Sequence, residues 1–177
     1  SSCVAVSRIC PTVPGADVDI VRCSSTQGAY DLVTHLLEQG HRRITMLSGP
    51  ADVSTAHERV AGCRQAFAAI ALSEATLTVL EGEFTVESGY AMAQQAIAQT
   101  TRPTALFAAN NFIAIGALKA LRELGVRVPE DICVVGFDDL PAALVVEPFL
   151  TVVAQPAYEM GRRATEVLLQ RIADPAA

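Results

Sequence analysis

Apolar and polar residues follow two rhythms along the chain, and these rhythms alternate. Short apolar runs bounded by turn residues are typical of strands that are buried on both faces. The expected strands are residues 4–7, 18–23, 43–48, 77–81, 104–108, 132–135 and 151–154. Longer stretches with apolar residues three or four positions apart predict amphipathic helices. The expected helices are residues 25–39, 54–72, 85–99, 112–124 and 156–172. This alternation predicts an α/β fold, with a parallel sheet and helices on both of its faces.

Two of the expected helices have the clearest apolar patterns. The apolar face of the helix at 25–39 consists of Ala29, Leu32, Val33, Leu36 and Leu37. In the helix at 112–124, the apolar stripe is expected to consist of Phe112, Ile115, Leu118, Leu121 and Leu124. A glycine follows each helix, and Gly40 is expected to end the first one in the left-handed conformation that closes many helices. Gly125 ends the second.

Polar side chains follow four successive strands of the predicted sheet. The strand at 132–135 runs through Gly136 and Phe137 directly into two adjacent carboxylates, Asp138 and Asp139. Open α/β sheets bind ligands outside the carboxyl ends of their strands, where such side chains gather at a common edge. The residues that follow the four strands are Asp52, Ser54, Thr55, Arg59, Glu83, Phe84, Asn110, Asn111, Asp138 and Asp139.

An arginine, an amide, a carboxylate and an aromatic ring together suit a polyhydroxylated ligand. Its hydroxyls can donate to a carboxylate and accept from a guanidinium, while its ring lies on an aromatic side chain. Thr55 and Arg59 are four residues apart on an expected helix, so they share one face. These features predict a binding site for a small hydroxyl-rich metabolite.

A structural alternative stays open for each of these residues taken singly. Thr55, Asn110, Asn111 and Asp138 all occupy plausible helix N-cap positions, where such side chains accept hydrogen bonds from free backbone amides. The arginine could equally be a solvated helix residue, and the phenylalanine could belong to the core. Convergence at one sheet edge, rather than any single residue, favours the binding site.

Composition narrows the class of protein. The chain has 177 residues, with 13 Lys plus Arg against 19 Asp plus Glu and a net charge of −6. This negative net charge argues against direct binding of nucleic acid, because phosphate binding needs a basic face. Its five cysteines are scattered and never spaced as CxxC, a usage typical of reduced thiols in a cytoplasmic protein. No apolar run approaches the length of a membrane span, and no signal peptide is visible at Ser1.

Recognisable motifs of catalysis are not found in the sequence. There is no Gly-flanked nucleophile, no His beside a nucleophile, no glycine loop for phosphates and no cluster of metal ligands. We therefore expect neither an enzyme nor a metal or other cofactor.

Several stretches resemble the lactose-repressor (LacI/GalR) family of transcription regulators, in order and in spacing, over about residues 18–172. The stretches are HLLEQGHRRITMLSGP, ERVAGCRQAF, EGEFTVESGYAMAQQ, RPTALFAANNFIAIGALKALRELGVRVPEDICVVGFDD and LTVVAQPAYEMGRRATEVLLQRI. The resemblance implies a periplasmic-binding-protein-like (type I) effector domain of two α/β subdomains. In that family a sugar, nucleobase or related metabolite binds between the subdomains, a separate helix-turn-helix reads DNA, and a dimer is the usual working unit.

The resemblance also implies the residues that contact the effector. By position these are Thr55, Arg59, Phe84, Asn110, Asp138 and Gln155, the last of them at a crossover between subdomains. Val53 stands where some members carry a polar contact, and Asn111 stands where the family more often has Asp. Both departures leave the identity of the effector open.

The resemblance divides the chain into three parts. Residues 1–26 are expected to be a remnant of the N-terminal subdomain, and residues 27–148 to be the C-terminal subdomain. Residues 149–177 are expected to form the crossover strand and a helix that returns to the first subdomain. The helix-turn-helix is not in the sequence, so we expect a piece of a longer regulator that acts on DNA only through that missing head.

Two other functions stay open at this point. A periplasmic sugar-binding protein of a transport system has the same fold, although the free cysteines and the Gly-His-Arg-Arg-Ile stretch speak against it. An enzyme could use Asp138 and Asp139 with Mg²⁺ for phosphoryl transfer, but the lysine and Ser/Thr set of such enzymes is not found at the matching junctions.

Overall fold

The main sheet of this computed structural model is parallel throughout. The structure describes residues 8–9, 20–70, 74–139 and 150–173. The sheet has the strand order β4-β3-β5-β6-β7. Its strands are β3 (Arg43–Ser48), β4 (Thr76–Glu81), β5 (Ala105–Ala108), β6 (Cys133–Phe137) and β7 (Thr151–Val153). The predicted α/β class is therefore confirmed.

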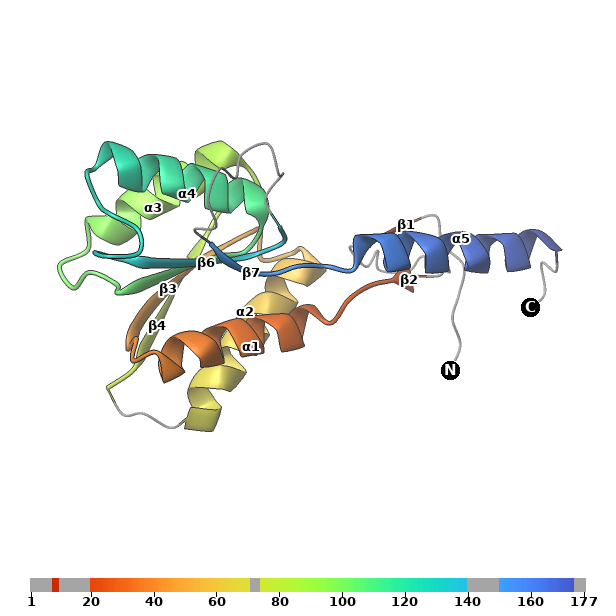
Figure 1. Cartoon of the computed structure of the whole chain (residues 1–177), viewed down its shortest axis with the longest axis horizontal. Helices are drawn as coiled ribbons and strands as arrows, with labels where there is room; N and C mark the ends of the chain where they lie inside the picture. The colour runs from red at the N-terminus through yellow and green to blue at the C-terminus, as the bar shows by residue number, and fades with distance from the viewer. Residues whose placement is uncertain (1–7, 10–19, 71–73, 140–149, 174–177) are drawn as a thin grey trace.

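Two helices cover each face of this sheet (Figure 1). The helices on one face are α1 (Ser25–Glu38) and α2 (Ser54–Ile70), and those on the other are α3 (Val86–Ile97) and α4 (Asn111–Glu123). Their apolar faces bury the central strands, whose largest buried side chains include Phe107, Met46 and Phe137. Among the described residues, no helix is long and apolar enough to cross a bilayer.

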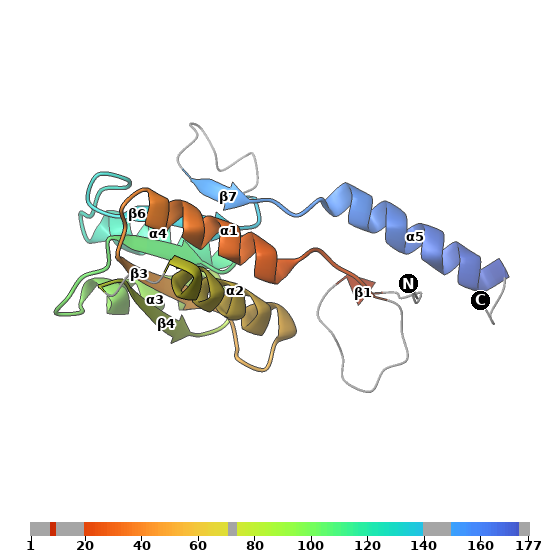
Figure 2. The same cartoon turned by 90° about the horizontal axis from the view of Figure 1, so that it is seen from below.

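A second, smaller group of elements lies apart from the main sheet (Figures 1 and 2). It consists of β1 (Arg8–Ile9), β2 (Ile20–Val21) and α5 (Ala157–Ala173). The two short strands pair in parallel, and α5 contacts both of them. Within the described residues, the chain passes between the two groups at residues 22–24 and at residues 154–156. We call these the crossover segments.

Most of the predicted elements are found within two residues of their expected ends. The strand at 43–48 and the start of the helix at 25 agree with the prediction, and Gly40 adopts the expected left-handed backbone with a φ of +92°. Gly125 has a φ of +68°. The expected strand at 4–7 lies outside the described residues.

The predicted apolar stripe of α4 is confirmed at Leu121, which is buried, but is wrong at its two ends. The structure buries Ile113, Ala114, Gly116, Ala117, Ala120 and Leu121, whereas Phe112 is 53% and Leu124 is 46% exposed. The predicted residues are each three positions apart, and three residues fall about 60° short of a helical turn, so that stripe winds around the helix. The buried face consists of Ile113, Leu121 and four small residues, and the apolar pattern did not distinguish the small ones as buried.

Small residues on α4 allow it to pack closely on α3. An added Cβ at Gly116 would lie 2.0 Å from the Val86 carbonyl oxygen, and one at Gly89 would lie 2.3 Å from the Ile113 carbonyl oxygen. Each helix thus brings a glycine against the backbone of the other. This contact holds the N-terminus of α4, and hence the end of β5, in its place beside the sheet edge.

Candidate functional site

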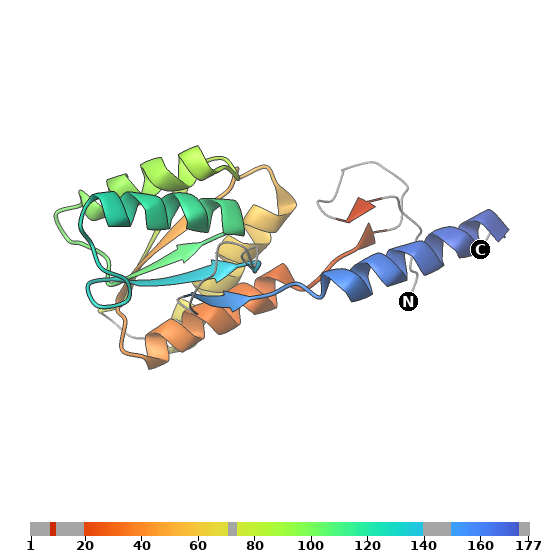
Figure 3. The ribbon, with the colours of Figure 1, turned by 45° about the horizontal axis from the view of Figure 1, so that its top comes forward.

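The carboxyl ends of the main strands face the second group of elements. In Figure 3 the arrows of β5 and β6 point toward the side where the crossover segments, the small sheet and α5 lie. Every residue of the predicted site except Gln155 follows one of these strand ends. The residues of the predicted site thus lie on the side of the sheet that faces the second group.

Arg59 lies at the centre of this edge. It projects from the second turn of α2 and is only 4% exposed. Its guanidinium carbon lies 3.9 Å from the centre of the Phe137 ring, and Nη1 donates a hydrogen bond to the carbonyl oxygen of Ala109. A cation over an aromatic face and a charged hydrogen bond both hold the guanidinium in place. The chain therefore fixes a positive charge between the ends of β5 and β6.

Asp138 follows directly after β6 and supplies the opposite charge. It has a φ of +70°, which is uncommon for residues other than glycine but several-fold enriched for Asp and Asn. Its backbone N–H donates to the carbonyl oxygen of Val153 at 2.9 Å, and its carboxylate accepts a hydrogen bond from Nε2 of Gln155. Asp138 is therefore attached to the end of β7 through its backbone and to the second crossover segment through its side chain.

Cys23, which the sequence analysis did not single out, also belongs to this cluster. Its thiol donates to Oε1 of Gln155 at 3.2 Å. Burial raises the pKa of the Cys23 thiol, the charge of Arg59 lowers it, and the charges of Asp138 and Glu58 raise it. All three charges thus lie near the thiol. No motif in the sequence marks Cys23, since only the fold brings the first crossover segment against the second.

Two of the polar residues at this edge, Asn110 and Asn111, make hydrogen bonds within the fold. Asn110 is 9% exposed and is the N-cap of α4, with its side-chain oxygen accepting from the N–H of Ile113 at 2.9 Å. The structural alternative therefore holds for Asn110. Asn111 is the first residue of α4, and its amide donates to the carbonyl oxygen of Asp139 at 3.4 Å.

Thr55 and Phe84 lie at the same edge, on neighbouring strand ends. Thr55 is in the first turn of α2, one turn before Arg59, so it is not a cap. Phe84 is half-buried, and its ring covers Gly49, where an added Cβ would lie 2.3 Å from the ring. The ring therefore packs against the backbone that follows β3, at a position where Gly49 has no side chain to displace it.

A pocket lies beside this cluster and is open to solvent. The residues that line it are Arg22, Cys23, Ser24, Ser25, Thr26 and Glu58. Arg22 and Glu58 form an ion pair across it at 2.7 Å. Within the part of the chain that the structure describes, no three His, Cys, Asp or Glu side chains are grouped to hold a metal ion.

Known proteins are similar to this chain in sequence and in fold. Residues 33–177 match the protein family described as "Periplasmic binding protein-like domain". The chain is 38% identical over 159 residues to the "HTH-type transcriptional repressor PurR" of Haemophilus influenzae (strain PittEE), a match that covers 90% of this chain and 47% of the relative. The chain thus spans about half the length of the curated relatives it matches.

Solved structures with the same fold include transcriptional regulators. A LacI family transcriptional regulator from Enterococcus faecium with bound ribose superposes with a TM-score of 0.80 at 30% identity, over 90% of this chain and 58% of that one. The complex of the transcriptional regulator CelR with cellobiose gives 0.82 at 36% identity, over 93% of this chain and 50% of that one. The relatives named here are transcriptional regulators.

Proposed function

Because the chain belongs to the LacI/GalR family of transcription regulators, as an effector-binding domain of the periplasmic binding protein-like type, we propose that it senses a small metabolite and thereby controls DNA binding. The metabolite is a sugar or a related hydroxyl-rich compound. DNA is read by a helix-turn-helix head of the whole regulator, and the regulator acts in the cytoplasm. The names of the relatives favour this function over that of a periplasmic sugar-binding protein.

The pair formed by Arg59 and Asp138 carries this proposal. The Arg59 guanidinium is buried and lies over the Phe137 ring. The Asp138 carboxylate comes directly after Phe137, at the end of β6. A sugar hydroxyl can accept from the first group and donate to the second. Phe84 adds an aromatic face and Val53 an apolar patch, and both suit the C–H face of a sugar ring.

The two crossover segments make a change of state possible. We assign residues 27–148 to one subdomain, residues 1–26 to a part of the other, and residues 149–177 to the crossover strand and the returning helix. A ligand that contacts both subdomains binds the closed arrangement more tightly than the open one and shifts the population toward it. In the whole regulator, this closure would move the DNA-binding heads relative to each other.

Calorimetry with ribose and cellobiose tests the proposed site. We expect at least one of them to bind with a Kd of about 1 mM or tighter. The Asp138→Asn variant should weaken that binding at least about ten-fold, because the amide donates where the carboxylate only accepts. Asp139→Asn is the matched control, since this adjacent carboxylate is exposed and should leave the Kd unchanged. Equal affinities in the parent and the Asp138→Asn variant would contradict the assignment of the site.

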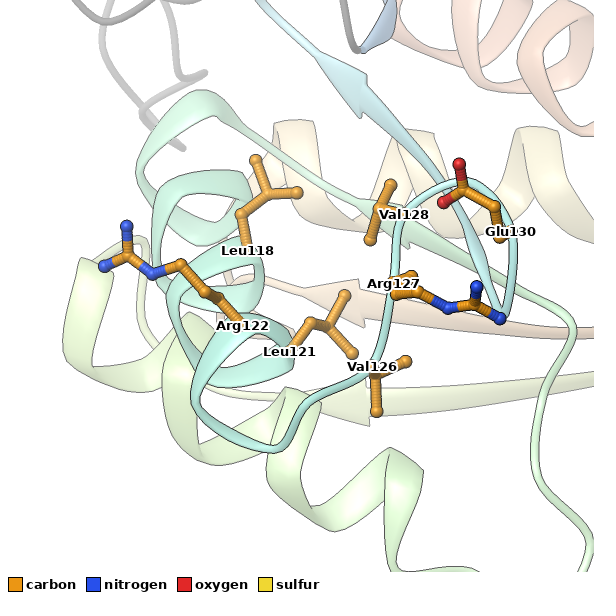
Figure 4. A pocket seen from close by; sticks show the side chains of 7 residues that line it. All are labelled: Leu118, Leu121, Arg122, Val126, Arg127, Val128 and Glu130. Atoms are coloured by element: carbon orange, nitrogen blue, oxygen red, sulfur yellow. The ribbon is translucent and has the colours of Figure 1, made fainter.

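We also propose that the regulator works as a homodimer through the outer face of α4. This face consists of Phe112, Ile115, Leu118, Lys119 and Arg122, which lie opposite the buried residues of the helix. A groove continues the face toward the loop that follows α4 (Figure 4). Its lining residues are Leu118, Leu121, Arg122, Val126, Arg127, Val128 and Glu130. A surface that carries apolar side chains and both signs of charge can pair with a second copy of itself across a two-fold axis.

Sedimentation measures this association directly. The Phe112→Glu variant is expected to dimerise at least about ten-fold more weakly than the parent, because it places a charge on the apolar centre of the face. Tyr158→Glu is the control, since Tyr158 is 81% exposed on α5, away from this face. A parent chain that stays monomeric, or a dimer that survives Phe112→Glu, would rule this surface out.

A further inference from the structure

Both crossover segments are joined to the end of β6 by one chain of side-chain hydrogen bonds. The Cys23 thiol on the first segment donates to Oε1 of Gln155 on the second, at 3.2 Å. Nε2 of the same amide donates to the carboxylate of Asp138. One glutamine therefore connects three parts of the chain that are distant in sequence.

The direction of these hydrogen bonds follows from the chemistry of the three groups. An ionised carboxylate can only accept, so the amide must turn its NH₂ group toward Asp138. Its carbonyl oxygen then faces the thiol, which is a donor. The order of donors and acceptors is thus complete, and it requires a side chain at position 155 that both donates and accepts.

We propose that Gln155 is a positioning residue, which holds the Asp138 carboxylate through one hydrogen bond and the first crossover segment through the other. We call the three side chains the crossover relay. The backbone of Asp138 also orients this carboxylate, because it has a positive φ and donates its N–H to the carbonyl oxygen of Val153. The hydrogen bonds of the relay do not depend on the proposed function. Their role in sensing does, because it requires a metabolite that binds Asp138 and competes for the oxygen held by Gln155.

The relay has a consequence for the two arrangements of the subdomains. The crossover segments are the parts of the chain that must change when the subdomains move. Because the same amide reaches Asp138 and Cys23, a ligand that displaces it from the carboxylate also disturbs its bond to the first segment. Occupancy of the site is thereby transmitted to both segments through one side chain.

An exchange of donor and acceptor tests the relay in the full chain without any ligand. The Gln155→Glu variant sets two carboxylates against each other, so we expect its melting temperature to fall by about 4 °C at pH 8. At pH 5 the loss should be smaller, since such a pair can share a proton. In the Gln155→Glu/Asp138→Asn double variant, the new amide can donate to the new carboxylate, and most of the loss should be recovered at both pH values.

Two comparisons make this result decisive. Gln65→Glu adds the same charge at an exposed position of α2 and should change the melting temperature little. If Gln155 only fills space, Asp138→Asn will not rescue Gln155→Glu and the pH dependence will be absent. Either result would overturn the proposal.

The reactivity of Cys23 gives a second readout that does not depend on stability. In the Gln155→Leu variant the thiol loses its acceptor, so alkylation of Cys23 by iodoacetamide should be at least about three-fold faster relative to Cys133, which serves as the internal reference in peptide mass spectrometry. An unchanged or slower rate would overturn the relay. If the relay passes these tests and none of the metabolites binds, the proposed function fails while the relay stands.

Discussion

Replacing Gly116 with alanine is expected to lower the free energy of unfolding by about 3 kcal/mol. In an exposed helix the same change would stabilise the chain by up to about 1 kcal/mol, because alanine is the better helix former. Here the new Cβ would lie 2.0 Å from the Val86 carbonyl oxygen and 2.7 Å from the Tyr90 backbone nitrogen. Both atoms belong to the backbone of α3 and cannot turn aside, so the two helices must separate.

Chemical denaturation of the full chain measures this difference. Gly161→Ala on α5 is the matched control, because an added Cβ there has no heavy atom within 4 Å. It should leave the stability unchanged or raise it slightly. If Gly116→Ala proved as stable as Gly161→Ala, the close packing of α3 on α4 would be wrong.

Replacing Arg59 with leucine is expected to weaken the binding of the metabolite selected by calorimetry at least about 100-fold, which corresponds to about 2.7 kcal/mol. The reason is that Arg59 is buried and held over Phe137 beside the carbonyl oxygen of Ala109, so a ligand group placed there meets a charge that is already desolvated. Arg59→Lys should lose less, about ten-fold, since an ammonium keeps the charge but not the planar fork of donors.

The same helix offers a control for the loss of a positive charge. Arg64 is exposed on α2, and Arg64→Leu should leave the Kd within two-fold of the parent. Thermal unfolding of each variant separates a lost contact from a lost fold, because leucine leaves the Ala109 oxygen without this donor and costs about 1–3 kcal/mol. Binding by a folded Arg59→Leu variant at the affinity of the parent would exclude Arg59 from the site.

Local patterns predicted the elements and their order well. The strand at 43–48 and the helix that begins at residue 25 depend on neighbours only a few positions away, as do the turns at Gly40 and Gly125. The alternation of strands and helices then placed several polar residues at one edge, because the strands of a parallel sheet all end on the same side. The resemblance to the LacI/GalR family was also visible in the sequence alone.

The face of α4 and the roles of single polar residues could not be predicted in this way. The sequence of α4 has apolar residues on every side, so only the contact with α3 and the sheet decides that Ala117 is buried and Phe112 is exposed. Asn110 suited both a cap and a ligand contact, and its bond to the N–H of Ile113 is a matter of geometry. Cys23 had no pattern at all around it.

By itself, the sequence determined the α/β class, the positions of the main strands and helices, and the presence of Arg59 and Asp138 after strands that end at one edge. Periodicity and turn residues act over a few positions, and for that reason they can be recognised in the chain without a structure. Only the tertiary structure decided that Arg59 is buried on Phe137 and that Gln155 joins Cys23 to Asp138. These contacts join residues far apart in the sequence, and their energy depends on distances that no local pattern contains.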